Sequence, residues 1–199
     1  MCGRYELVNG ERVFIRFRVT NKTPPILDNV DVRPSQQVLV LTTDHELRLM
    51  KWGLVPSWAK DEKIGFSTFN ARSEGIAEKA SFKRPLRSQR IIIPASAFME
   101  WQGEKGHKTK YRIARRDGDL FGFAGLYDIW TSPSGEALTS CTIITTTANR
   151  EVQPVHLRMP VILLPEDEDA WLNPDMTEVE EIKSYLRPYP DDLLAAVPA

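Results

Sequence analysis

The sequence is poor in the residues that build metal sites and disulfide frameworks. It holds two cysteines, Cys2 and Cys141, and three histidines among 199 residues. The two cysteines are too far apart for a metal-ligand spacing, and two thiols cannot make a framework of several disulfides. Cys141 lies in an apolar run typical of a buried strand, where we expect it to act as a small hydrophobic residue. The sequence therefore predicts no metal and no cofactor.

Long apolar runs and targeting signals are also missing. No run approaches the roughly 20 residues that cross a bilayer, and the N-terminus lacks the basic and apolar segments of a secretory signal. There is no internal repeat or low-complexity linker. At 199 residues and 42% hydrophobic, we expect one domain over residues 1–199. We expect a monomer that avoids membranes and works in the cytoplasm beside the nucleoid, or in the nucleus of a eukaryote.

The net charge of −1 hides an asymmetry along the chain. Residues 1–116 hold 22 Lys and Arg against 12 Asp and Glu, while residues 117–199 hold 4 against 15. The two segments thus carry +10 and −11. Such a division could give a basic face that binds nucleic acid on a soluble protein, or the two halves could neutralise each other within one fold.

Apolar patterning predicts an α+β fold with a mostly antiparallel, barrel-like β core and peripheral helices. We expect a hairpin from residues 37–43 and 46–54, and an acidic helical part over 165–199. The remaining strands are expected at 90–94, 98–101, 110–116, 120–130, 137–147 and 161–164, and helices at 9–18, 77–86 (stopped by Pro85), 166–172 and 177–186.

Cys2 is the most reactive group that the sequence offers. Removal of Met1 would leave a cysteine whose thiol and free α-amine can condense with an aldehyde into a five-membered thiazolidine ring. The thiolate could instead act as a nucleophile with its own amine as general base. An α-amine titrates near pH 8, so it is partly neutral under working conditions. The alternative is an ordinary residue in a frayed terminus.

Three polar positions each have an arginine two residues later: Cys2 with Arg4, Asn70 with Arg72 and His156 with Arg158. In extended backbone, residues i and i+2 face the same side, so each pair would aim a polar group and a guanidinium at one surface. Guanidinium groups match phosphate oxygens, so this surface would suit an anionic substrate. The alternative for each arginine is an exposed salt bridge.

Glu100 lies between Met99 and Trp101, where an apolar setting would raise the pKa of its carboxyl and suit it to general acid or base catalysis. His156 is the histidine with an ordered context, and Asn70 could orient the Cys2 amine or cap a turn. Structural roles remain open for all three. The tryptophans Trp52, Trp58 and Trp101 could stack on bases, or they could pack in the core.

These motifs together resemble the SRAP family, the SOS response-associated peptidase or abasic-site processing proteins. The resemblance covers most of the chain, and its motifs occur in the family's order over residues 1–164. They are Met1-Cys2-Gly3-Arg4, residues 52–60, Asn70-Ala71-Arg72-Ser73-Glu74, Phe98-Met99-Glu100-Trp101, residues 123–126 and His156-Leu157-Arg158-Met159-Pro160.

The resemblance implies an abasic-site sensor that links covalently to single-stranded DNA and that also removes its own Met1. Cys2 would form the thiazolidine with the sugar aldehyde, and Asn70 would position the Cys2 amine and the sugar. Glu100 would move protons, and His156 would assist at the sugar hydroxyl. Arg4, Arg72 and Arg158 would bind phosphates, and Trp52, Trp58 and Trp101 would contact the strand.

Two positions depart from the family's usual motifs. Leu157 replaces an aspartate, and Met99 replaces a tyrosine. Leu157 should point away from the site if its segment is extended, so losing the carboxylate need not harm catalysis. Met99 alternates away from Glu100 and should matter mainly to packing. The leucine leaves in doubt any contact that the aspartate makes in relatives.

Two other functions remain open from the sequence. Glutamine amidotransferases with an N-terminal nucleophile also begin Met-Cys-Gly, and glutaminase turnover without DNA would favour that alternative. A non-catalytic nucleic-acid-binding module would bind undamaged strands in a salt-sensitive way and would be indifferent to substitution of Cys2.

Overall fold

The computed structural model describes residues 2–21, 28–104 and 106–199, so expectations for Met1 and for the proline-containing segment 22–27 lie outside the described residues. The strands are β1 (Tyr5–Leu7), β2 (Asn29–Val32), β3 (Gln37–Leu41), β4 (Leu47–Trp52), β5 (Asn70–Arg72), β6 (Arg90–Ala95), β7 (Ala97–Gln102), β8 (Thr109–Arg115), β9 (Phe121–Thr131), β10 (Ala137–Thr147), β11 (Arg158–Pro160) and β12 (Leu194–Pro198). The α-helices are α1 (Arg12–Arg16), α2 (Lys83–Ser88), α3 (Glu168–Leu172) and α4 (Val179–Ser184), with 3-10 turns η1 (Glu62–Phe66), η2 (Ser73–Gly75) and η3 (Pro165–Asp167).

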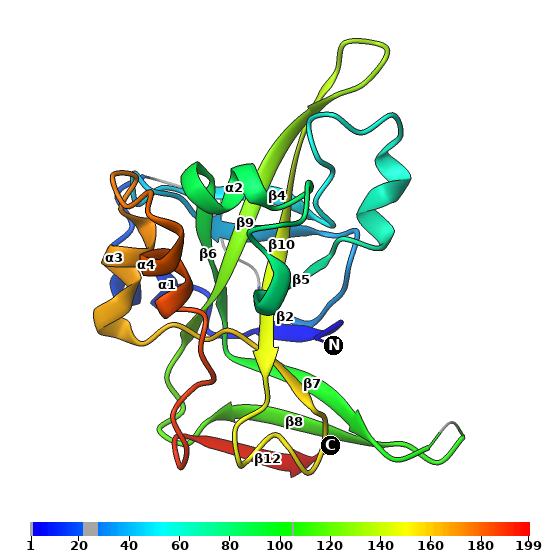
Figure 1. Cartoon of the computed structure of the whole chain (residues 1–199). Coiled ribbons are helices and arrows are strands. Elements are labelled where there is room, and N and C mark those ends of the chain that lie inside the picture. Colours follow the sequence, from blue (N-terminus) through cyan, green and yellow to red (C-terminus); the bar gives the residue numbers. More distant parts are fainter. Residues whose placement is uncertain (1, 22–27, 105) are drawn as a thin grey trace.

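Five strands close into a barrel. Their order is β10, β4, β3, β6 and β9, and β9 pairs again with β10 to complete the ring. All these pairings are antiparallel except that between β4 and β10, which is parallel. Short helices lie around the barrel (Figure 1). The predicted α+β fold with a barrel-like, mostly antiparallel core is confirmed.

A second sheet lies beside the barrel in the order β12, β8, β7, β1 and β2. In Figure 1 its strands β7, β8 and β12 lie below the barrel. The N-terminal strand β1 is an interior strand of this sheet, between β7 and β2. Residues 5–7 are therefore held by strands on both sides, which is not the arrangement of a frayed segment.

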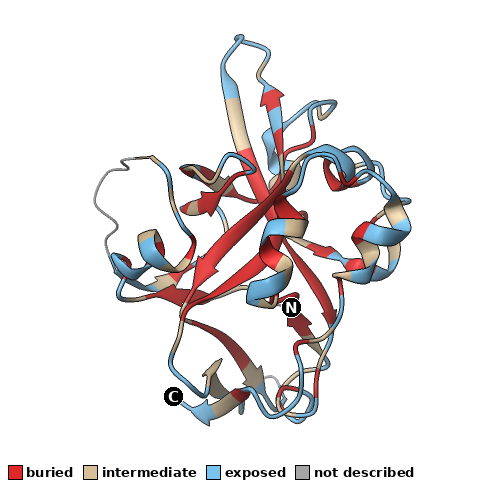
Figure 2. Ribbon diagram, turned by 90° about the vertical axis from the view of Figure 1, so that its left-hand side faces the viewer, coloured by how far each residue is buried: buried red, intermediate tan, exposed pale blue. Residues whose placement is uncertain are grey.

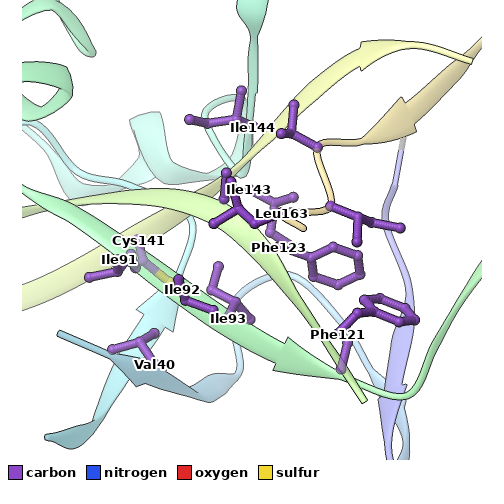
Figure 3. Packing of buried hydrophobic residues seen from close by; sticks show 14 of the residues in the cluster. Val40, Ile91, Ile92, Ile93, Phe121, Phe123, Cys141, Ile143, Ile144 and Leu163 are labelled. Atoms are coloured by element: carbon purple, nitrogen blue, oxygen red, sulfur yellow. The ribbon is translucent and has the colours of Figure 1, made fainter. Parts of the chain in front are cut away.

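The barrel is filled by the residues that the apolar runs predicted. Ile91, Ile92 and Ile93 of β6 are fully buried, because β6 lies between β3 and β9 inside the barrel wall. Phe121 and Phe123 of β9 pack their rings edge to face, with 5.3 Å between centroids. Figure 3 shows this cluster, and Figure 2 shows that burial concentrates on the central strands.

A close backbone approach in the barrel requires glycine at position 125. A Cβ atom added to Gly125 would meet the carbonyl oxygen of Thr142 at 2.8 Å and the side chain of Ile93 at 3.0 Å. The obstacle is backbone, which cannot rotate away. Gly125 therefore allows β9 and β10 to pair tightly at the place where the barrel closes.

Several boundaries differ from those predicted. The helix expected over residues 9–18 is confined to Arg12–Arg16. The helix expected over 77–86 forms at Lys83–Ser88, and Pro85 lies in its first turn, where no backbone N–H is needed. The strand expected at 161–164 is reduced to a single bridge between Ile162 and Phe123, and the ladder with β10 forms earlier, at Arg158–Pro160. The acidic helices were predicted correctly, but the short strands β1, β2, β5 and β12 were missed.

The C-terminal part is attached to the barrel through Arg90. This guanidinium is 2% exposed and donates hydrogen bonds to four backbone carbonyls, including those of Trp171 at 2.7 Å and Leu86 at 2.9 Å. Buried apolar side chains from both parts of the chain form one continuous cluster. Among the described residues, no helix is both long and apolar enough to span a bilayer.

Candidate active site

Strand β10 brings together two of the predicted motifs. On one edge it pairs with β4 and then with β5, which places Asn70 beside Ile143 and Arg72 beside Thr145. On the other edge it pairs with β9 and then with β11. Segments far apart in the sequence thus lie on the two sides of the lower half of β10 (Figure 1).

The N-terminal residues reach this place by running antiparallel to β7. Tyr5 pairs with Phe98, and the N–H of Met99 donates to the carbonyl of Arg4 at 2.9 Å. Continuing this register carries Cys2 alongside the half of β7 that contains Glu100. The motif that begins the chain and the motif that contains the buried carboxylate therefore lie on neighbouring strands.

Cys2 is fully buried and is held by Asn70. The side-chain Nδ2 of Asn70 donates to the backbone carbonyl of Cys2 at 2.7 Å. The Sγ atom of Cys2 lies 3.9 Å from the carbonyl oxygen of Arg4, within the range of a weak S–H donor. The Oδ1 atom of Asn70 is buried and has no hydrogen-bond partner among the described residues. Asn70 thus fixes the Cys2 backbone and keeps an acceptor at the site.

The thiol environment disfavours the thiolate. Burial is the main cause that raises the pKa of Cys2 far above its usual value, and the negative charge of Glu100 raises it further. Glu100 is itself 4% exposed. The carboxylate therefore acts on the thiol through its charge, and it belongs to the strand that runs antiparallel to the N-terminal residues.

His156 is half-buried and its ring is oriented by its own chain. The backbone N–H of Arg158 donates to Nδ1 of His156 at 2.9 Å. Nδ1 of His156 also lies 3.0 Å from the carbonyl oxygen of Arg158, to which a protonated Nδ1 would donate. These two backbone contacts fix the orientation of the ring and are compatible with either neutral tautomer.

The three predicted phosphate-binding arginines differ in what they contact. Arg4 makes an ion pair with Asp31, with Nε and Oδ1 2.9 Å apart, and its guanidinium lies over the Trp101 ring, 5.2 Å from the centroid. Arg158 pairs with Glu74. Arg72 is exposed, and no ion pair of Arg72 is found among the described residues.

The three predicted DNA-binding tryptophans also differ in how far they are buried. Trp52 is fully buried, donates from Nε1 to the carbonyl of Phe69 at 2.7 Å and packs against Tyr5. It lies in the core, so its predicted contact with a DNA strand is wrong for this structure. Trp58 is 57% exposed, and Trp101 is half-buried beneath Arg4. Both have faces that a base could reach.

The sequence motifs contained one site residue without an assigned role. Glu74 ends the segment 70–74, and its pairing with Arg158 was not foreseen. Thr145 and Asp31 carried no sequence signal at all, because tertiary pairing alone brings them to Arg158 and Arg4. Of the two departures from the family's motifs, Leu157 is 73% exposed and Met99 is buried at 3%.

No group of three or more histidine, cysteine or acidic side chains suited to a metal occurs in the described ranges. The chemistry that the site offers is that of a thiol, a buried carboxylate, an imidazole N–H and guanidinium groups. Such a set can transfer protons at a carbonyl carbon while cations hold an anionic substrate.

Two proteins similar to this chain are named abasic site processing proteins. A Bacillus subtilis relative, the abasic site processing protein YoqW, is 42% identical over 98% of this chain and 91% of its own length. The chicken abasic site processing protein HMCES is 34% identical over 74% of this chain and 51% of its own length.

Solved structures show the same fold. A crystal structure of a Bacteroides thetaiotaomicron protein matches with a TM-score of 0.92 and 31% identity, covering 99% of this chain and 91% of the other. A Bordetella bronchiseptica protein matches with a TM-score of 0.84 and 28% identity over 100% and 99% of the two chains. The profile of the SOS response associated peptidase (SRAP) family matches residues 1–199, and the chain belongs to this family.

Proposed function

We propose that this protein is a DNA-processing enzyme of the damage response that captures abasic sites in single-stranded DNA through Cys2. Residues 1–199 would act as one domain. The observation that carries the proposal is that Asn70 binds the Cys2 backbone and that the strand bearing Glu100 runs alongside the N-terminal residues, in a chain whose relatives are named abasic site processing proteins. Met1 must leave first, because the reaction needs the α-amine of Cys2.

The proposed capture is a condensation in which atoms balance. The neutral Cys2 amine adds to the aldehyde carbon of the ring-opened sugar, and loss of one water gives an imine. The sulfur then adds to the imine carbon, and the thiol proton ends on the nitrogen. One C–N bond and one C–S bond form, the C=O bond breaks, and one water is released. Nothing is oxidised or reduced.

Glu100 is the proposed proton carrier. Because burial keeps the Cys2 thiol protonated, ring closure needs a base that removes the thiol proton only as the C–S bond forms. A buried carboxylate beside the thiol can take this proton and pass it to the nitrogen. In the removal of Met1, the same carboxylate would activate the water that hydrolyses the Met1–Cys2 peptide bond and would then protonate the new amine.

Asn70 and His156 would orient and polarise the substrate. The hydrogen bond from Asn70 to the Cys2 carbonyl restrains the backbone that carries both the amine and the thiol. Holding two reacting groups in the productive geometry is a large source of rate enhancement. The imidazole of His156 would hydrogen-bond to the sugar hydroxyl during ring opening.

The strand itself would be bound by charge and by stacking. Arg72, Arg4 and Arg158 would contact phosphates, while Trp58 and Trp101 would stack on bases. Single-stranded DNA fits this set because its bases are free to stack on exposed aromatic rings.

Incubation with an abasic oligonucleotide followed by a denaturing gel tests the proposal. We expect a covalent band with the native protein and none with Cys2→Ser. An alanine inserted ahead of Cys2 moves the amine away from the thiol and should also abolish the band. Intact-mass measurement should show loss of one methionine from the native protein. A band that survives either change, or no band with the native protein, contradicts the proposal.

A further inference from the structure

The guanidinium of Arg158 is the most heavily occupied of the predicted phosphate-binding groups. Its two terminal nitrogens contact the two carboxylate oxygens of Glu74, and the Nη2–Oε2 distance is 3.0 Å. Nη2 also donates to the carbonyl of Thr145 at 2.7 Å and to its Oγ1 at 3.2 Å. Both nitrogens that would grip a phosphate in a bidentate manner are thus already paired.

The two partners of this pair differ in exposure. The side chain of Arg158 is 17% exposed, whereas that of Glu74 is 52% exposed. The arginine therefore lies in the protein surface, and the carboxylate covers it from the solvent side. A ligand that approaches Arg158 from solution would meet the position that the Glu74 carboxylate occupies.

A phosphodiester presents the same pattern of acceptors as a carboxylate. Both offer two anionic oxygens to the paired N–H groups of a guanidinium fork. Glu74 lies in η2, two residues beyond the end of β5, the strand that holds Asn70 and Arg72. A DNA strand bound at those residues would therefore bring a phosphate near Arg158.

Arg158 would keep its place without Glu74. The two contacts with Thr145 come from β10 inside the barrel wall and do not depend on the carboxylate. In addition, the Nε atom of Arg158 is buried and has no hydrogen-bond partner within the described part of the chain. The guanidinium of Arg158 thus has an Nε–H without an acceptor and is also held by Thr145. Both features suit an arginine that changes its anionic partner.

We propose that Glu74 occupies, in the free protein, the position on Arg158 that a DNA phosphate takes when a strand binds. Strand binding then exchanges one anion for another, and Glu74 lowers the affinity for DNA in general. Only DNA strands that make further contacts at the site gain enough binding free energy to displace the Glu74 carboxylate. The inference rests on the proposed function, because it assumes that a DNA strand passes Arg158.

The test measures binding of an undamaged single-stranded oligonucleotide by fluorescence anisotropy at one fixed salt concentration. Glu74→Gln keeps the shape of the side chain and removes its charge. We expect it to bind about twofold to fivefold more tightly than the native protein, the factor that corresponds to breaking one exposed ion pair. The control is Glu78→Gln, because Glu78 is an exposed glutamate nearby in the chain for which no ion pair is found among the described residues. This variant should bind within about twofold of the native protein.

Arg158→Gln supplies the decisive comparison. In that background Glu74→Gln should give no gain, because the gain depends on freeing the Arg158 guanidinium. If Arg158→Gln does not fold, Arg158→Lys takes its place, and the gain should shrink because a lysine cannot bind in a bidentate manner. A gain that persists without Arg158 indicates general charge repulsion and overturns the exchange. Weaker binding by Glu74→Gln also overturns it, since Glu74 would then be positioning Arg158.

The result is separable from that of the crosslinking experiment. The anisotropy measurement uses undamaged DNA and needs neither an aldehyde nor the Cys2 amine. A protein that fails to crosslink but shows the Arg158-dependent gain contradicts the capture chemistry and retains the exchange. A protein that crosslinks but shows no gain contradicts the exchange alone, and absence of any strand binding overturns it as well.

Discussion

Replacing Asn70 with alanine is expected to slow covalent capture of an abasic strand by about 5-fold to 150-fold. Asn70 donates one hydrogen bond, at 2.7 Å, to the carbonyl of a fully buried residue. Leaving such an acceptor without its donor costs about 1–3 kcal/mol. This free energy holds the Cys2 amine and thiol in place. At about 1.4 kcal/mol for each tenfold change in rate, its loss corresponds to the expected slowing of about 5-fold to 150-fold.

Asn70→Asp gives the same prediction a pH signature. The carboxylate would set an acceptor oxygen against the carbonyl of Cys2, and the resulting repulsion favours the neutral acid and raises the pKa of the new carboxyl. As pH falls, the acid gains a proton that it can donate to the carbonyl. The ratio of the Asn70→Asp rate to the native rate should therefore rise from pH 8 to about pH 5. The native rate itself should fall, because the Cys2 amine becomes protonated.

Single-turnover crosslinking with excess protein, followed on denaturing gels, measures these rates. Thermal denaturation shows whether each variant is folded. Asn21→Ala is the matched control, since Asn21 donates a similar hydrogen bond, at 3.0 Å, to the carbonyl of Leu47 at the start of β4. A folded Asn70→Ala variant with a rate within twofold of the native protein would refute the reasoning. So would an Asn70→Asp to native ratio that does not change with pH.

Three further outcomes follow from burial and charge. Trp58→Ala should weaken binding of the DNA strand by about 1–3 kcal/mol without lowering the melting temperature. Trp52→Phe should instead lower the melting temperature and leave the salt dependence of DNA binding unchanged. The reverse pattern would contradict a DNA-binding role for Trp58 and a core role for Trp52. Gly125→Ala should destabilise the fold by about 1–3 kcal/mol, because its Cβ would meet a backbone carbonyl at 2.8 Å. An unchanged midpoint in chemical denaturation would contradict this prediction. The hydrogen bond from Arg158 is the main cause that lowers the pKa of Glu74 in the folded protein. The pair therefore stabilises the fold, by less than about 1 kcal/mol, above the ordinary carboxyl pKa of about 4.3, and this contribution is lost as pH falls through the lower folded value. The stability difference between the native protein and Glu74→Gln should accordingly close below about pH 4 in denaturation curves.

The strands that could be predicted are those whose own residues determine their environment. The run at 91–93 is apolar at every position because β6 is enclosed on both faces. The long apolar stretches of β9 and β10 likewise predict buried strands. The strands that were missed or misplaced are β1, β2, β5, β11 and β12, which are three to five residues long and depend on hydrogen bonds to other strands of the fold. Local pattern contains no information about such partners.

The sequence by itself determined which groups can react and bind: a thiol at Cys2, an amide at Asn70, a carboxylate at Glu100 and arginines beside them. Only the tertiary structure decided which of these groups are available. It buries Trp52 in the core and pairs Arg158 with Glu74. The reason is physical, because the identity of a side chain fixes its charge and chemistry, whereas its burial and its partners depend on which strands β10 and β7 bring together.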